Sequence, residues 1–165
     1  MAGGAGVADT HRMNWEPNTT TDAPQVLLVE DGGDDVELAQ EAFRRVKGAG
    51  PLEVARDGVE ALEVLAGRNG APPMRPRLVL LDLKLPRLDG LDVLRHVKGD
   101  PALRTIPVVM LTSSAEERDI AECYRLGANG YLVKPVEFAR FLQLVEAVCA
   151  YWLHQNRAVP PSHRA

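Results

Sequence analysis

The chain has 165 residues, 45% of them hydrophobic, which is enough for one domain with a full core. Its 19 basic and 23 acidic residues give a net charge of −4, so the composition predicts neither a nucleic-acid surface nor attraction to an anionic membrane. Cys123 and Cys149 lack the spacing of a zinc site, and no secretory signal or membrane span appears. We therefore expect a cytoplasmic protein whose two thiols are buried and reduced.

The sequence divides into three segments. Residues 1–23 mix small and polar residues without an apolar period, which predicts a disordered leader outside the fold. Residues 24–154 carry the patterns of one folded domain, and residues 155–165 are expected to form a C-terminal tail. The domain therefore leaves no room for a second one.

Short apolar runs alternate with longer amphipathic segments from residue 25 onward. The apolar runs are too short for helices, and several are apolar throughout, as strands buried on both faces require. This alternation predicts βαβ units. In chain order we predict strand 25–29, helix 34–46, strand 52–55, helix 58–65, strand 78–81, helix 89–98, strand 106–111, helix 115–126, strand 130–133 and helix 136–153.

The ends of several helices carry their own signals. Asp35, Asp89 and Ser114 suit the capping position or the first turn of a helix, and Gly127 suits a left-handed helix stop. Residues 67–75 are rich in glycine and proline and are expected to form a surface loop.

Right-handed crossovers place helices on both faces of such a sheet. The predicted fold is thus a doubly wound α/β sandwich of three layers, with a five-stranded parallel sheet in the order 2-1-3-4-5, as in flavodoxin and CheY. Ligands bind such sheets beyond the carboxyl ends of the strands, where the winding direction reverses. That point lies between the first and third strands.

Polar residues follow four of the five predicted strands. Glu30 and Asp31 follow the first, Asp82 the third, Thr112 the fourth and Lys134 the fifth. Three carboxylates at one edge repel one another, so a cation must compensate. Oxygen ligands without His or Cys favour Mg²⁺, for which Mn²⁺ can substitute, and Asp31 and Asp82 are the expected direct ligands.

This constellation suggests phosphoryl transfer to an aspartate. Asp82 would attack the phosphorus, while Lys134 and the Thr112 hydroxyl would contact phosphoryl oxygens. The product, a mixed anhydride, would be a short-lived covalent switch. Taken singly, each residue is better explained as a helix cap or a solvated loop residue, and only their combination favours chemistry.

Four motifs carry a resemblance to a known family. Val-Glu-Asp, Leu-Leu-Asp-Leu-Lys-Leu-Pro-Arg-Leu-Asp-Gly, Met-Leu-Thr-Ser and Gly-Ala-Asn-Gly-Tyr-Leu-Val-Lys-Pro occur in order between residues 25 and 153. This set resembles the response-regulator receiver domain of two-component signalling. The resemblance implies a histidine-kinase donor, Mg²⁺, and phosphorylation of Asp82.

The same resemblance assigns further roles. Glu30 would hold the metal through water, and the backbone carbonyl of Lys84 would be a direct ligand. Thr112 and Tyr131 match the family's switch pair, and Lys134 matches its phosphoryl-binding lysine, followed by a cis peptide bond to Pro135. Two departures, Gly32-Gly33 in place of a frequent Asn-Pro and the lysine at position 84, are expected to affect kinetics.

The last predicted helix is apolar on more than one face, which suggests an interface. We expect a homodimer through Leu144, Val148, Tyr151 and Trp152. This ending, and the lack of an output domain, resemble small receivers paired with phytochrome-type histidine kinases. The expected partners are such a kinase, a second copy and a downstream protein.

Three other functions remain open at this stage. A haloacid-dehalogenase-like phosphatase also uses an aspartyl nucleophile, but Asp82-Leu83-Lys84 lacks its second aspartate. A flavodoxin-like protein would need a Ser/Thr-rich phosphate loop that the sequence does not show. A receiver that acts as a scaffold without phosphorylation is the third.

Overall fold

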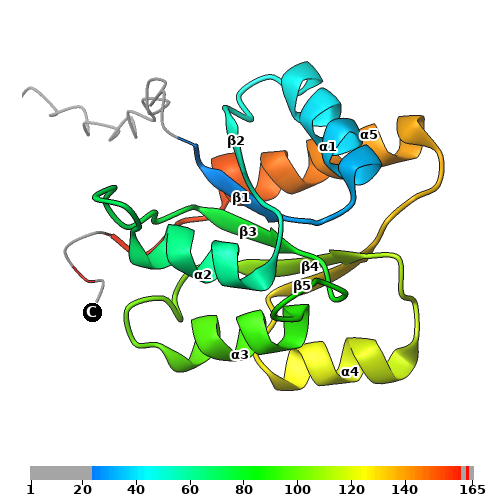
Figure 1. Cartoon of the computed structure of the whole chain (residues 1–165). Helices are drawn as coiled ribbons and strands as arrows, with labels where there is room; N and C mark the ends of the chain where they lie inside the picture. The colour runs from blue at the N-terminus through cyan, green and yellow to red at the C-terminus, as the bar shows by residue number, and fades with distance from the viewer. Residues whose placement is uncertain (1–23, 161–162, 164–165) are drawn as a thin grey trace, which may run out of the picture.

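The computed structural model describes residues 24–160 and 163. The predicted leader, residues 1–23, lies outside the described residues, as does part of the predicted tail. Figure 1 shows a central sheet between two layers of helices, with α1 and α5 on one face and α2, α3 and α4 on the other. The three-layer α/β prediction is confirmed.

Five parallel strands form the sheet in the order β2-β1-β3-β4-β5, as predicted. In register, Val29 at the end of β1 lies between Ala55 of β2 and Leu81 of β3. The carboxyl ends of β1 and β3 therefore meet at one edge. The strands are β1 (Val26–Val29), β2 (Leu52–Ala55), β3 (Leu78–Leu81), β4 (Val108–Thr112) and β5 (Gly130–Val133).

The helices differ from the predicted ranges mainly at their ends. α4 begins two residues later than predicted. The last helix begins at Phe138, because Glu137 is in an extended conformation; Val136 and Glu137 are both exposed. The helices are α1 (Gly33–Arg45), α2 (Gly58–Ala66), α3 (Gly90–Gly99), α4 (Glu117–Arg125) and α5 (Phe138–Cys149), followed by a π-helical segment, η1 (Ala150–Gln155).

Strand residues pack alternately into two cores. In β1, Val26 and Leu28 face the helices α1 and α5, while Leu27 and Val29 face α2, α3 and α4. Because both faces are covered, β1, β3 and β4 are buried along their whole length. This explains why their sequences are apolar without alternation.

Side chains and glycines fix several helix ends. Asp89 caps α3 by accepting from the Asp92 N–H, as its position suggested, and Gly127 adopts the left-handed conformation that ends α4. Asp57 caps α2 through the Glu60 N–H. Sequence reasoning did not single out this cap.

The π-helical segment η1 continues α5 to Gln155 and buries Leu153. Its winding is marked by the bond from the Asn156 N–H to the Tyr151 carbonyl, at 2.6 Å. Within α5, Val148 is 8% exposed and belongs to the core cluster, so little of its surface is free for a partner; its place in a dimer interface stays a prediction. Leu144 and Trp152 are half-buried, and Tyr151 is 53% exposed.

Both thiols are free and buried, as expected. Burial raises the pKa of Cys123 to about 11 and that of Cys149 to about 12. They are therefore inert thiols. Among the described residues, no helix combines the length and apolar character needed to cross a membrane.

Candidate functional site

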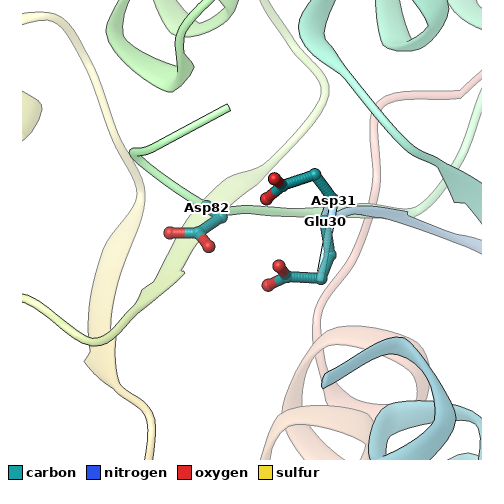
Figure 2. A group of neighbouring side chains, drawn as sticks. All are labelled: Glu30, Asp31 and Asp82. Carbon is teal, nitrogen blue, oxygen red and sulfur yellow. The ribbon is translucent and has the colours of Figure 1, made fainter. Parts of the chain in front are cut away.

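Strand pairing carries the acidic residues past the ends of β1 and β3. The Glu30 N–H donates to the Ala55 carbonyl at 3.0 Å, and the Asp82 N–H donates to the Val29 carbonyl at 3.1 Å. Each ladder thus extends one residue beyond its strand. Figure 2 shows Glu30 and Asp31 leaving the end of β1 with their carboxyl groups turned toward the side on which Asp82 lies.

The oxygens of Glu30, Asp31 and Asp82 lie within 4.8 Å of one another. At that distance, and at an effective dielectric constant near 20, two carboxylates repel by about 3 kcal/mol. Glu30 is 3% exposed and Asp82 is 9% exposed, so water screens them little, whereas Asp31 is exposed. A cluster of oxygen donors without nitrogen or sulfur suits Mg²⁺ or Mn²⁺, as the sequence predicted.

Lys134 supplies one positive charge to this cluster. Its Nζ donates to Glu30 Oε2, to Asp82 Oδ2 at 3.1 Å and to Asp35 Oδ2 at 3.2 Å. Burial lowers the pKa of Lys134, but the bond to Glu30 and the charges of Asp82 and Glu30 outweigh burial, so its pKa is raised above the ordinary value. Lys134 therefore stays protonated.

The peptide bond before Pro135 corrects one expectation. No cis peptide bond occurs among the described residues, so Lys134–Pro135 is trans. Lys134 still points at Asp82, because the backbone ladder from its N–H to the Thr112 carbonyl, at 2.8 Å, continues β5 and directs the side chain into the site. The inward aim of the lysine does not need a cis bond.

The buried side chain of Glu30 also accepts a hydrogen bond from the backbone. The Glu30 Oε1 atom accepts from the Gly32 N–H at 3.0 Å. Burial raises the pKa of Glu30, although the bonds from Lys134 and Gly32 hold part of that rise back, and the charge of Asp82 adds to it. Both oxygens of Glu30 are thus occupied by protein donors.

Thr112 and Tyr131 lie on neighbouring strands. Thr112 is the last residue of β4 and is 3% exposed. The Tyr131 hydroxyl on β5 donates to the Ser114 carbonyl at 2.9 Å, which links the ring to the loop that follows Thr112. Tyr131 is therefore hydrogen-bonded to the loop that follows Thr112, while the motion of these two predicted switch residues stays a prediction.

The loop between β3 and α3 is closed tightly around the residues after Asp82. The Gly90 N–H donates to the Leu83 carbonyl at 2.8 Å. Arg87 adopts φ +66°, and its guanidinium contacts Asp57 Oδ2 at 3.1 Å. Lys84 is exposed, and its side chain makes no hydrogen bond or ion pair within the described part of the chain.

Sequence reasoning brought together Glu30, Asp31, Asp82 and Lys134 and missed Asp35. Asp35 was considered only as a residue of the first helical turn. Its position five residues after Glu30, on a helix that starts at the same sheet edge, is the signal that could have indicated it. A cavity of about 40 Å³ beside these residues is lined by apolar groups that include Leu38, Val136 and Phe138.

With the site described, comparison with known proteins decides the family. A model of the response regulator receiver domain matches residues 26–146. The chain belongs to the response-regulator receiver family. Proteins of this family are phosphoacceptor signalling proteins and not classical enzymes, so neither the phosphatase nor the flavodoxin-like alternative holds.

Individual relatives narrow the comparison. The "Probable methanogenesis regulatory protein FilR2" of Methanothrix harundinacea is 42% identical over 83% of this chain and 88% of its own length. Response regulator Rcp1 of Synechocystis is 39% identical over 78% of this chain and 88% of its own length.

Solved structures agree with these relatives. The Mn²⁺-bound form of Rcp1 superposes with a TM-score of 0.75 at 35% identity, over 83% of this chain and 100% of that one. The bacteriophytochrome response regulator AtBRR superposes with a TM-score of 0.64 at 48% identity, over 80% of this chain and 96% of that one. This receiver is therefore similar to phytochrome-associated regulators along nearly their whole length.

Proposed function

We propose that this receiver accepts a phosphoryl group on Asp82 from a histidine kinase, in the presence of Mg²⁺. The observation that carries the proposal is the cluster of Glu30, Asp31 and Asp82 oxygens within 4.8 Å, with the Lys134 ammonium 3.1 Å from Asp82. Family membership supplies the class of reaction. The contact between Lys134 and Asp82 supports Asp82 as the nucleophile, with a cation beside it.

The residues present fit a divalent metal. Asp31, Asp82 and the Lys84 carbonyl would bind it directly, and Glu30 would hold it through water, because both Glu30 oxygens already accept from protein donors. When bound, Mg²⁺ neutralises the carboxylates and the incoming phosphoryl charge. Rcp1 is similar to this chain and has a Mn²⁺-bound form, which supports a divalent metal here with Mn²⁺ as a substitute.

The covalent step requires one oxygen of Asp82. That oxygen attacks phosphorus, the bond from phosphorus to the donor histidine nitrogen breaks, and the electron pair returns to the imidazole. Lys134 donates to a phosphoryl oxygen, and the Thr112 hydroxyl donates to another. The aspartyl phosphate formed is the signalling state.

The favoured donor is a phytochrome-type histidine kinase. Similarity to the response regulator Rcp1 and to the bacteriophytochrome response regulator AtBRR supports this donor. We place the reaction in the cytoplasm, without nucleic acid or membrane as a partner, on the strength of the composition and net charge. The downstream partner is another protein.

The output would pass through the switch pair and the C-terminal region. Movement of Thr112 toward the phosphoryl group would release the Tyr131–Ser114 bond and alter the β4–α4 loop. Tyr151 is exposed and packs edge-on against Trp152, with ring centroids 4.8 Å apart. Together with the half-buried Leu144, these aromatic rings would form the centre of a homodimer interface.

Phosphotransfer from a purified phytochrome-type kinase tests the proposal. The kinase is labelled on its histidine with radioactive ATP, freed of nucleotide, and mixed with this protein and Mg²⁺. We expect rapid transfer of label to the wild-type chain and none to Asp82→Asn. Label that stays on the kinase would contradict the donor, and equal labelling of Asp82→Asn would contradict the site.

A further inference from the structure

Lys134 contacts a third carboxylate that belongs to a helix and not to a strand end. Its Nζ lies 3.2 Å from Asp35 Oδ2, in addition to its contacts with Glu30 and Asp82. A lysine ammonium has three N–H donors. The three carboxylates accept one each, so Asp35 completes the hydrogen bonding of Lys134.

The chain around Gly32 allows this approach. A Cβ at Gly32 would lie 3.2 Å from Glu30 Oε1 and 3.5 Å from Asp35 Oδ2, closer than a side chain normally packs in the first case. Without that Cβ, Glu30 folds back onto the Gly32 N–H, and Asp35 reaches over the start of α1. Both carboxylates therefore meet the same ammonium.

The three carboxylates lie in different surroundings. The side chains of Glu30 and Asp82 are 4% and 11% exposed, whereas that of Asp35 is 47% exposed. Of the three partners of Lys134, Asp35 is thus the one exposed to water. A phosphodonor arriving from solvent meets the lysine with Asp35 already bound to it.

We propose that Asp35 is a positioning residue that holds the Lys134 ammonium, screens its charge, and so weakens binding of an anionic phosphodonor. The inference rests on the proposed function, because it gives Asp35 an effect on phosphodonor binding at the same site. An acyl phosphate or phosphohistidine needs both the positive charge and a free N–H of Lys134. Asp35 competes for both.

Asp34 provides a matched control. It is exposed in the same first turn of α1, and it makes no hydrogen bond or ion pair in the described part of the chain. Asp34→Asn and Asp35→Asn remove the same charge from the same helix end. Only Asp35→Asn removes an ion pair with Lys134.

The first readout is the rate of phosphorylation by acetyl phosphate in saturating Mg²⁺, measured over a range of acetyl phosphate concentrations. We expect Asp35→Asn to lower KM about threefold relative to Asp34→Asn, the effect of one partly exposed ion pair, with little change in the maximal rate. Equal KM values for the two variants would overturn the proposal.

The second readout is hydrogen exchange of the Lys134 ammonium, followed by NMR in the unphosphorylated protein and assigned by its loss in Lys134→Arg. Asp35→Asn should speed exchange while Asp34→Asn leaves it unchanged, and equal rates in all three proteins would overturn the inference. This readout needs no phosphorylation, so it still tests the Asp35 contact if the wild-type protein accepts no phosphoryl group. Failure of the wild-type protein to accept a phosphoryl group would refute the proposed function alone.

Discussion

At the scale of single residues, the site holds more carboxylates than cationic groups. Glu30, Asp82 and Asp35 surround the single ammonium of Lys134, and Asp31 adds a fourth carboxylate nearby. The raised pKa of Lys134 keeps it cationic, yet the negative charges still outnumber it. A second cation would therefore stabilise the site, and the proposed Mg²⁺ would supply it.

Replacing Lys134 should make the fold depend on metal. In Lys134→Met the buried Glu30 and Asp82 lose their cation, so we expect the free energy of unfolding to fall by about 2 kcal/mol in chelator. Saturating Mg²⁺ should recover most of that loss, more than it stabilises the wild-type protein. Urea denaturation with and without Mg²⁺ measures both effects, and an equal loss under both conditions would contradict the account.

The strand-end residues were predicted and Asp35 was missed, for a physical reason. Carboxyl ends of neighbouring parallel strands share an edge, so topology alone places Glu30 beside Asp82 and directs Lys134 toward both. The contact of Asp35 depends on the approach of α1 to β5 and on the space at Gly32, which no sequence period encodes. The trans bond before Pro135 likewise shows that strand pairing was sufficient to aim the lysine.

At the scale of elements, the start of α3 holds the backbone of Asp82 in place. A Cβ at Gly90 would lie 2.1 Å from the Asp82 carbonyl oxygen and 2.7 Å from Leu83 Cα. Both neighbours are backbone atoms, which cannot rotate away. Gly90 thus allows α3 to begin directly against the residue that we propose is phosphorylated.

Gly90→Ala should therefore disturb fold and site together. We expect a loss of about 3 kcal/mol in the free energy of unfolding, because overpacking forces the loop to shift. Gly99→Ala, at the other end of α3 with no atom within 4 Å of the added Cβ, is the control and should leave stability nearly unchanged. Chemical denaturation of both variants tests this, and similar stabilities would contradict the close packing.

A half-buried lysine joins the far end of α3 to the sheet. Lys98 Nζ donates to the Arg104 and Ile106 carbonyls and to Asn129 Oδ1, which also accepts from the Val108 N–H. Burial lowers the pKa of Lys98 to about 8. The folded protein therefore releases this proton at a lower pH than the unfolded chain does.

Stability should rise with pH as Lys98 deprotonates. Between pH 8 and 10.5 the unfolded chain binds more protons at this residue, so raising pH favours the folded state. Relative to Lys98→Met, which cannot titrate, the wild-type free energy of unfolding should increase by about 1 kcal/mol across the lower part of that range, after allowance for partial exposure. Parallel pH dependences in urea denaturation would contradict the lowered pKa.

Element types were predictable where burial fixes the pattern, and element ends were less so. The five strands follow from apolar runs that two helical layers must cover. The late start of α4 depends on the loop after Thr112, where the Ser114 hydroxyl bonds Asp119. The π-helical turn at Ala150–Gln155 depends on packing Leu153 into the core, which sequence period cannot express.

At the scale of the whole molecule, the proposed chemistry and the proposed dimer surface lie on different parts of the fold. The acidic cluster lies beyond the carboxyl ends of β1 and β3, while Tyr151 lies in η1, which follows the end of α5. Because Val148 is buried, we restrict the proposed interface to the exposed side of α5 and η1.

Removing the exposed aromatic ring should weaken self-association. Tyr151 is 53% exposed, and Tyr124 on α4 is 51% exposed, so Tyr124→Ser is a control of matched exposure. We expect equilibrium sedimentation to show a wild-type dimer whose dissociation constant rises at least about tenfold in Tyr151→Ser, as for a modest aromatic anchor, and stays unchanged in Tyr124→Ser. A wild-type monomer at high micromolar concentration, phosphorylated or not, would contradict the dimer.

The central claim, that Asp82 is the phosphoacceptor, is tested most directly by intact mass after incubation with acetyl phosphate and Mg²⁺. The account predicts an added mass of about 80 Da that is labile in base, requires Mg²⁺ and is absent from Asp82→Asn. An adduct of the same size and lability on Asp82→Asn would contradict it.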